Sequence, residues 1–293
     1  MDKILRCITT DGAVMVSAID SSDIVHIAKK IHKTTPSATA ALGRLLTGTS
    51  MMGAMLKQKD ASINLRIAAD GPLGVAIAVA DSNGNVRGYV GNANCPTEHY
   101  SNGKINVAKA VGTDGVLNVM RDYGTGEPYI GQVPLVSGEI AEDITNYYAT
   151  SEQIPTACAL GVLIDKTDGE VLFAGGFLIQ LLPGADDAIA QRIEENVKKL
   201  EPVTTMLANG MTPLDMAKKA LDGFDVEVLD EYPIHYICTC SKEKIAGLIK
   251  NMGKEEISAM IKEDKGASAH CHFCNKTYNF SEEELEKMLD ELS

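Results

Sequence analysis

The sequence contains no tryptophan, and aromatic residues make up only 5% of its 293 residues. A platform on which nucleic-acid bases could stack is therefore poorly supplied. Basic residues are also few, with 27 Lys and Arg against 40 Asp and Glu, so the net charge is −13. Because nucleic-acid binding depends on many cationic contacts to phosphate, this charge disfavours a nucleic-acid partner and favours solubility.

Long apolar runs are missing as well. No run is long enough to span a membrane, and residues 1–12 read as a strand and not as a signal peptide. We therefore expect a cytoplasmic protein without a membrane partner. Thiols are kept reduced in that compartment, so clustered cysteines there favour metal binding or redox sensing over a disulfide framework. The chain also shows no Ser/His/Asp spacing and no carboxylate cluster typical of a metal site, so we do not predict an enzyme.

Four of the seven cysteines lie in two close pairs near the end of the chain. These are Cys238, Cys240, Cys271 and Cys274. Two such pairs separated by a loop-sized interval have the spacing of a structural zinc site, in which four thiolates complete a tetrahedron. The alternatives are two disulfides or four unrelated thiols. A Cys-x-Cys disulfide closes a small, strained ring, which disfavours it as a permanent bond. His270 and His272 flank Cys271 and are alternative ligands.

The segment around these cysteines, residues 233–293, is small and polar and would have a marginal core by itself. Zinc binding in zinc-finger peptides is worth roughly 10–16 kcal/mol and appears as folding free energy. Removing the metal should therefore unfold this module. Thiolates on a metal are also nucleophiles, so an oxidant could convert them to disulfides and expel the zinc.

The rest of the chain predicts an α+β protein. We divide it into a β-rich N-terminal domain with packed helices (1–182), a helical linker (183–232) and a small C-terminal zinc-binding module (233–293). The first two expected strands form a hairpin around Asp11-Gly12, and the next three form a meander. The strands are expected at residues 4–9, 14–19, 62–69, 73–80, 85–90, 116–121, 129–133, 157–164, 171–181, 234–237 and 275–280. Helices are expected at 24–31, 38–57, 137–148, 186–200 and 254–261, with further helices opening after Thr212, Ser241 and Ser281. Ser21 or Ser22 is expected to cap the first helix, and Ser281 with Glu284 to form a capping box for the last. The helix at 38–57 is apolar on nearly all faces and must be buried.

Other reactive side chains have simpler interpretations. Glu139, Glu142 and Asp143 could form an acid–base pair, but a favourable interaction with the dipole of the helix after Ser137 explains them better. The isolated thiols are expected to be buried and unreactive, and the two histidines of the first helix are not expected to bind a ligand. These residues are Cys7, Cys95, Cys158, His26 and His32.

Several motifs of the chain resemble one known family. Cys238-Thr239-Cys240-Ser241 and Cys271-His272-Phe273-Cys274-Asn275 resemble the zinc centre of the redox-regulated heat-shock chaperones of bacteria, the thirty-three-kilodalton heat-shock proteins. Further matches in the body extend this resemblance over essentially the whole chain. They are DGPLG at 70–74, VRGYV at 86–90, GQVPLVSGEIAED at 131–143 and GGFLIQ at 175–180.

The resemblance implies an ATP-independent holdase that is inactive while reduced and zinc-bound. Oxidants such as peroxide or hypochlorous acid would form Cys238–Cys240 and Cys271–Cys274 disulfides and release the one zinc ion. The module and linker would then unfold, apolar surface would bind unfolded or misfolded client proteins, and the active form would be a homodimer. Such a protein would protect against aggregation under oxidative and heat stress, and reduction would reverse the switch.

Three other functions compete with this interpretation. A thiol–disulfide oxidoreductase using Cys271 and Cys274 usually needs a βαβ context and only two cysteines. A zinc-ribbon nucleic-acid binder is opposed by the charge. A hydrolase or transferase site in the β-rich body has no visible residue pattern.

Overall fold

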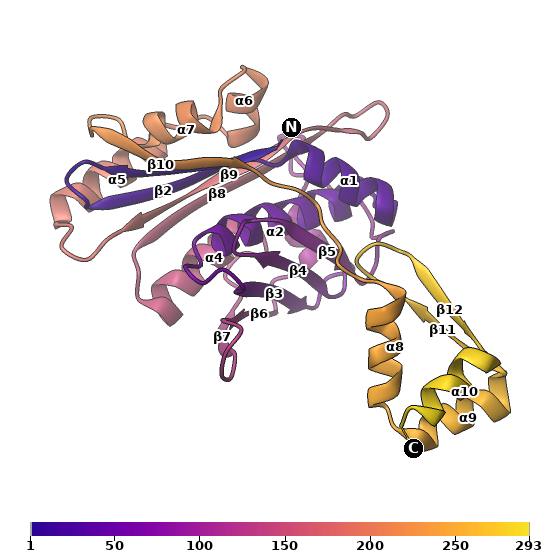
Figure 1. Ribbon diagram of the computed structural model, residues 1–293. Coiled ribbons are helices and arrows are strands. Elements are labelled where there is room, and N and C mark those ends of the chain that lie inside the picture. Colours follow the sequence, from indigo (N-terminus) through magenta and orange to yellow (C-terminus); the bar gives the residue numbers. More distant parts are fainter. Residues whose placement is uncertain (1, 293) are drawn as a thin grey trace. The chain divides into compact units, whose positions relative to one another are not determined.

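The computed structural model of the protein describes residues 2–292 (Figure 1). The chain divides after Ile237 into two compact units, Met1–Ile237 and Cys238–Ser293. Both units combine helices with antiparallel sheets, so the predicted α+β class is confirmed. Within the described residues, none of the helices combines the length and hydrophobicity that a bilayer crossing requires.

The first sheet of the N-terminal unit has the strand order β10-β1-β2-β9-β8, with every neighbour antiparallel. Its strands are β1 (Lys3–Thr9), β2 (Val14–Asp20), β8 (Thr156–Ile164), β9 (Val171–Leu181) and β10 (Val226–Pro233). The predicted hairpin of β1 and β2 is confirmed, and Gly12 supplies the positive φ of 72° that its turn requires. The edge strand β10 was not predicted.

The second sheet has the order β5-β4-β3-β6-β7 and contains the predicted meander of β3, β4 and β5. Its strands are β3 (Ser62–Ala69), β4 (Ala76–Asp81), β5 (Val86–Val90), β6 (Gly115–Asp122) and β7 (Tyr129–Pro134). Strand β4 begins later than expected because the preceding turn is held by another segment. The amide N–H of Leu73 donates to the carbonyl of Ala110, 2.9 Å away, in the short helix α3 (Val107–Val111), which was not predicted.

Helix α2 (Pro36–Ala54) contacts strands of both sheets and forms the centre of this unit (Figure 1). All of its residues except Pro36 and Arg44 are buried, which confirms the predicted buried helix. It begins two residues earlier than predicted because proline is well tolerated in the first turn. Helix α1 (Ser22–His32) packs beside it.

The carboxylate of Asp2 caps helix α1, where a serine was expected. It accepts hydrogen bonds from the amides of Asp23 and Ile24, at 2.8 and 2.7 Å. The hydroxyl of Ser21 is instead shared with Thr47, 2.7 Å away. The helix start therefore depends on a residue far away in sequence, which local capping rules do not reveal.

The helix predicted from Ser137 begins at Ala141 as α4 (Ala141–Tyr147) and continues as a π-helical turn, η1 (Tyr148–Glu152). The reason is the buried Asp143, whose carboxylate accepts from the amides of Val136, Ser137 and Ile140 at 2.8 to 3.1 Å. These bonds hold the preceding residues in a turn, and Ile140 adopts a φ of 74° there.

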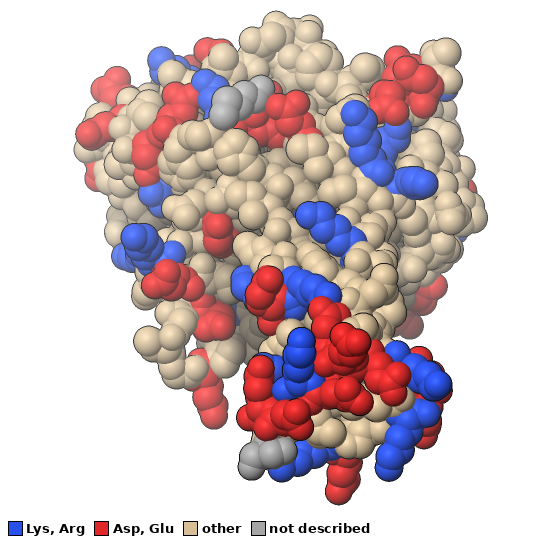
Figure 2. Space-filling model, turned by 45° about the vertical axis from the view of Figure 1, so that its right-hand side comes forward, with Lys and Arg blue, Asp and Glu red and all other residues tan. Residues whose placement is uncertain are grey.

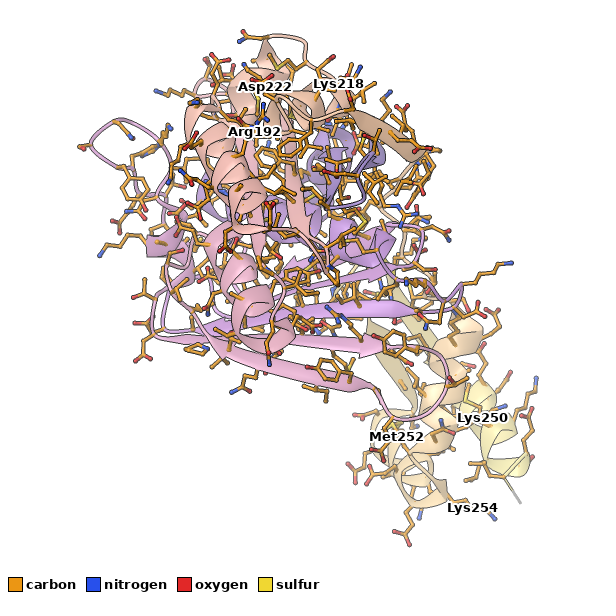
Figure 3. All side chains as sticks on the ribbon, turned by 90° about the vertical axis from the view of Figure 1, so that its left-hand side faces the viewer. Arg192, Lys218, Asp222, Lys250, Met252 and Lys254 are labelled. Carbon is orange, nitrogen blue, oxygen red and sulfur yellow. The ribbon has the colours of Figure 1, made fainter. Side chains whose placement is uncertain are left out.

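The outer face of the first sheet is covered by α6 (Val203–Ala208) and α7 (Pro213–Ala220), with α5 (Asp187–Lys199) packed on α7. Figure 3 shows this layer with Arg192, Lys218 and Asp222 labelled. Asn196 of α5 donates to the carbonyls of Ala220 and Asp222 at 3.2 and 2.9 Å, which ties α5 to the end of α7. Helix α6 was not predicted.

The C-terminal unit is built from two strands and three helices. They are α8 (Lys242–Asn251), α9 (Lys254–Asp264), β11 (Gly266–His270), β12 (Thr277–Ser281) and α10 (Glu282–Asp290). Within residues 238–292, its core has five buried side chains with partly buried apolar ones packed around them; the buried five are Ile249, Ile257, Phe280, Leu285 and Met288. Its surface carries acidic and basic groups interspersed (Figure 2). The predicted capping box at Ser281 and Glu284 opens α10 and is confirmed.

The strand expected at residues 234–237 is reduced to a single parallel bridge between Tyr236 and Val86. The segment is nevertheless anchored in the N-terminal unit, because Ile234 is only 1% exposed. The hydroxyl of Tyr236 donates to the carbonyl of Gly88 at 2.9 Å and lies 3.2 Å from Nε2 of His32. These contacts hold the chain firmly up to the last residues before Cys238.

Candidate metal centre

The four cysteines come from two short segments that the C-terminal unit brings together. Cys238 and Cys240 lie in the extended segment just before α8, which begins where the Ser241 hydroxyl accepts from the amide of Lys244. Cys271 and Cys274 lie in the turn between β11 and β12. That turn is closed by the hydrogen bond from the Cys271 amide to the Lys276 carbonyl, 2.9 Å long.

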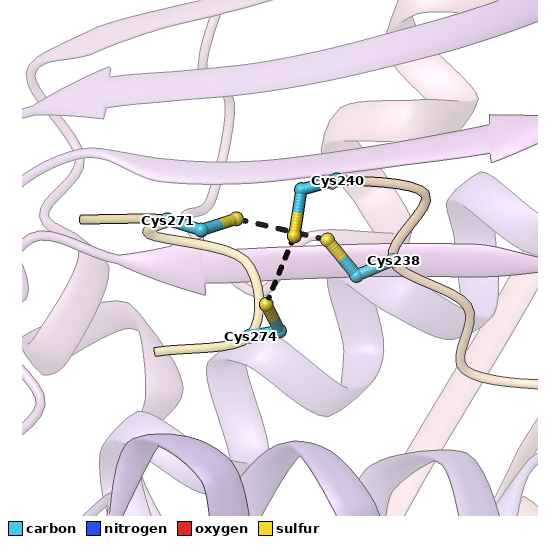
Figure 4. A group of neighbouring side chains, drawn as sticks. All are labelled: Cys238, Cys240, Cys271 and Cys274. Carbon is cyan, nitrogen blue, oxygen red and sulfur yellow. Dashed lines mark hydrogen bonds between the residues drawn. The ribbon is translucent and has the colours of Figure 1, made fainter. Parts of the chain in front are cut away.

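The sulfurs form one compact cluster (Figure 4). All four Sγ atoms lie within 4.8 Å of one another, and each residue is partly buried. Sγ of Cys238 is 3.7 Å from that of Cys271, and Sγ of Cys240 is 3.3 Å from that of Cys274. A tetrahedral zinc site with Zn–S bonds of about 2.3 Å has its sulfurs about 3.8 Å apart. The donor set and its dimensions therefore fit one zinc ion held by four thiolates.

The protonation equilibria of the cluster also indicate a cation site. Burial works against ionisation of Cys240, but hydrogen bonds from Tyr278 and from the other thiols lower the pKa of Cys240 to about 7. Burial and the neighbouring thiols raise the pKa of Cys274 to about 12, and burial raises that of Cys238. The Cys240 thiolate therefore forms readily, whereas ionisation of Cys238 and Cys274 is opposed by desolvation and by hydrogen bonds with the neighbouring thiols. A bound cation would remove that opposition.

Tyr278 of β12 belongs to the cluster and was missed in the sequence analysis. Its hydroxyl oxygen lies 3.1 Å from Sγ of Cys240 and 3.3 Å from the carbonyl oxygen of the same residue. The hydrogen bond to Cys240 raises the pKa of Tyr278 to about 12, so the phenol stays protonated and can donate to sulfur. The signal that could have revealed it is the β11–β12 hairpin register, which pairs Tyr278 with Ala269 close to the cysteine turn.

The two flanking histidines are not brought into the cluster. Among residues 2–292, the group of neighbouring metal-ligating side chains around the turn contains the four cysteines alone. His270 and His272 instead lie edge to face with their ring centroids 5.6 Å apart, and Nδ1 of His270 is 3.2 Å from the Thr277 hydroxyl. The structure therefore favours four sulfur ligands over a mixed set.

Two of the three isolated thiols are buried as the sequence predicts, and the third is partly buried. Cys7 and Cys95 are buried and Cys158 is partly buried, and all three are free. Burial raises the pKa of Cys7 to about 11 and that of Cys158 to about 12. Burial also raises the pKa of Cys95. These values keep the thiols protonated and unreactive at neutral pH.

The carboxylates after Ser137 do not form an acid–base pair. Asp143 is committed to capping α4, and Glu139 is ion-paired with Arg44 and accepts from the Tyr100 hydroxyl at 2.6 Å. Burial opposes the ionisation of Glu139, but the Arg44 charge and the Tyr100 hydrogen bond lower its pKa. Glu139 is therefore a structural anion, but the dipole explanation was wrong for it: it lies before α4 and is held by Arg44, Tyr100 and the amide of Ala108 in α3.

A β-rich body followed by a small four-cysteine unit is the architecture of a class of two-part chaperones, and comparison with known proteins identifies the class. A sequence model described as Hsp33 protein matches residues 2–281, so the chain belongs to the Hsp33 chaperone family. It is 47% identical to a 33 kDa chaperonin of Clostridioides difficile over 291 residues, 99% of each chain. It is 48% identical to that of Acetivibrio thermocellus over 288 residues, 98% of this chain and 97% of the relative.

A solved relative confirms the architecture. The crystal structure of the 33 kDa chaperonin (heat shock protein 33 homolog) of Thermotoga maritima is similar with a TM-score of 0.89 and 36% identity. The match covers 99% of this chain and 98% of that one. The resemblance seen in the sequence motifs is thus confirmed over the full chain.

Proposed function

We propose that this protein is a redox-regulated, ATP-independent holdase, and not an enzyme, acting in the cytoplasm under oxidative and heat stress. In the reduced state Cys238, Cys240, Cys271 and Cys274 would hold one zinc ion, which keeps the four sulfurs deprotonated. The four-sulfur cluster is the observation that carries the proposal, because its thiols lie close enough together to hold one metal ion and are also oxidisable.

Oxidation would convert each close pair to a disulfide, Cys238 with Cys240 and Cys271 with Cys274. Two thiolates give two electrons to one peroxide molecule, which takes up two protons and leaves as two waters. In the reduced arrangement, Sγ contacts of 3.7 and 3.3 Å join Cys238 to Cys271 and Cys240 to Cys274, from one pair to the other. Disulfides within the pairs would thus remove the link that the metal makes between the segment before α8 and the turn between β11 and β12. The C-terminal unit would then be held by its core of five buried side chains.

Unfolding would then extend to the linker at residues 183–232. Helices α6 and α7 cover buried apolar side chains on the outer face of the first sheet, including Leu5, Val16 and Phe177. Their departure would expose a contiguous apolar surface, which is the kind of surface that binds unfolded polypeptides. We propose unfolded or misfolded proteins as the partners, a homodimer as the active form, and reduction as the reversal.

The test is a light-scattering assay of a heat-aggregating client protein, with reduced zinc-loaded protein compared with peroxide-treated protein. Suppression of aggregation only after oxidation, without added ATP, is the expected result. Cys95→Ala serves as the matched control, because its thiol is buried outside the cluster and its loss should leave the switch intact. Equal protection by the reduced and oxidised forms would contradict the redox control.

A further inference from the structure

Strand β10 forms one edge of the first sheet and has β1 as its neighbour there. Strand β10 pairs with β1 along its full length, from Lys3 opposite Pro233 to Thr9 opposite Val226. We propose that β10 is a removable edge strand, and that after its release β1 binds an extended client segment rich in apolar and acidic residues by strand addition. This inference rests on the proposed function, since β10 lies at the end of the linker.

Strand β1 is built to stay in place when β10 leaves. Its other edge pairs with β2, and Ile4, Leu5 and Cys7 are at most 1% exposed. In contrast, no residue of β10 is fully buried, and Val228 and Leu229 are 43% and 48% exposed. The pairing is also interrupted, because the register shifts between Arg6 and Cys7 and leaves a bulge in β10.

The charges of β1 and β10 are complementary, and they indicate which kind of peptide the β1 edge would bind. β1 carries Lys3 and Arg6 and no acidic residue, whereas β10 carries three acidic residues and no basic one. Arg6 pairs with Asp230, its Nε lying 2.9 Å from Oδ1, and Lys3 pairs with Glu231. Both pairs are partly exposed, so each stabilises β10 only weakly. In a protein of net charge −13, the uncovered β1 edge would be a local cationic template.

The backbone of β1 supplies the rest of the binding energy without regard to sequence. Backbone bonds from Ile234 N–H to the Asp2 carbonyl and from Thr10 N–H to the Asp225 carbonyl frame the ladder at its two ends. Because donors alternate along an antiparallel strand, the amides of Ile4, Arg6 and Ile8 face β10, and those of the residues between them face β2. An incoming strand would satisfy these three amides and the carbonyls beside them.

The first experiment uses a fluorescent peptide with the sequence of residues 226–233 and measures its anisotropy with the full-length protein. Oxidised, zinc-free protein should bind the peptide, whereas reduced protein should bind it much more weakly because its own β10 occupies the edge. The same peptide with its three acidic residues replaced by lysine should bind less tightly. If the lysine peptide binds the oxidised protein as well as the acidic one, the charge argument is wrong.

Backbone methylation separates strand addition from nonspecific apolar binding. In the β10 register, the amides of Glu227, Asp230 and Tyr232 face β1, and those of Val228 and Glu231 face away. N-methylation at the first three positions should abolish peptide binding, and methylation at the other two should leave it unchanged. Equal effects of the two methylated peptides would overturn the inference, and this test needs no protein variant.

A pair of arginine variants tests the charge of the template. Arg6→Gln should weaken binding of the acidic peptide to the oxidised protein about two- to fivefold, as expected for a partly exposed ion pair. Arg66→Gln is the matched control, because Arg66 is an exposed strand arginine of the other sheet, in β3. A loss of affinity in the control equal to that in Arg6→Gln would contradict the assignment to β1.

Amide hydrogen exchange resolved by residue gives the decisive readout. On oxidation, the amides of Ile4, Arg6 and Ile8 should lose protection while those of Leu5 and Cys7 keep it, and peptide should restore the first set. If oxidised protein suppresses aggregation while all five amides stay protected, the inference is overturned and the proposed function stands. That result would mean that β1 keeps its own β10 or pairs with the β10 of a second copy. Failure of oxidised protein to suppress aggregation would count against the proposed function, while the peptide still tests the edge.

Discussion

Replacing one ligand of the sulfur cluster should unfold the C-terminal unit and spare the rest of the chain. The core of that unit has five buried side chains, Ile249, Ile257, Phe280, Leu285 and Met288. At about 1.5–3 kcal/mol for each buried side chain, this core contributes about 8–15 kcal/mol of apolar burial. Zinc bound by four cysteines contributes about 10–16 kcal/mol in small zinc domains. The metal would therefore stabilise the unit about as much as the burial of these five side chains does.

The variant for this experiment is Cys274→Ser, studied in its reduced form. Zinc content is measured by elemental analysis, and hydrogen exchange is measured by mass spectrometry on the full chain. We expect loss of tight zinc binding and loss of protection in α8, α9 and α10, while strands β1 to β9 keep their protection. Cys95→Ala is the control, since it also removes one thiol but lies outside the cluster. Tight zinc and full protection in Cys274→Ser would refute the four-thiolate assignment.

Three further changes test the packing and electrostatics of the two units. Ile257→Ala should destabilise the C-terminal unit by about 2–5 kcal/mol, measured by chemical denaturation, because Ile257 is fully buried in a small core. Burial raises the pKa of Asp2 from 3.8 to about 7, so its contribution to stability is present below about pH 4 and is lost as pH rises through 7. Between pH 4 and pH 8 this loss of unfolding free energy is about 4 kcal/mol at most, and it should be absent in Asp2→Asn, as measured by thermal melts at the two pH values. Glu152→Gln should destabilise the N-terminal unit by about 3–5 kcal/mol, because it leaves the largely buried Arg121 without its 2.9 Å partner; an unchanged melting temperature would contradict this.

Local patterns were sufficient for much of the fold. The alternation of apolar residues around Asp11-Gly12 and the glycine-rich turns of the meander predict their strands, although β4 begins three residues later than expected. The apolar character of α2 on all faces predicts its burial between other elements. The cysteine spacing predicts the cluster of four sulfurs, because pair spacing and turn geometry are both local properties.

Features that depend on distant partners were not visible. Strand β10 has three acidic residues among eight and no clear alternation, and it becomes a strand because it pairs with the backbone of β1, from the other end of the chain. The cap of α1 comes from Asp2, and Asp143 rather than Ser137 sets the start of α4. Tyr278 joins the cluster only because the β11–β12 register places it there.

The central claim is that the sulfur cluster controls client binding, and a single time course tests it. Reduced, zinc-loaded protein is treated with peroxide at mildly elevated temperature, and released zinc, free thiols and suppression of client aggregation are measured in the same samples. The account predicts that one zinc ion and four thiols are lost together with the onset of protection. Protection that begins while zinc and thiols are retained, or zinc release that brings no protection, would contradict it.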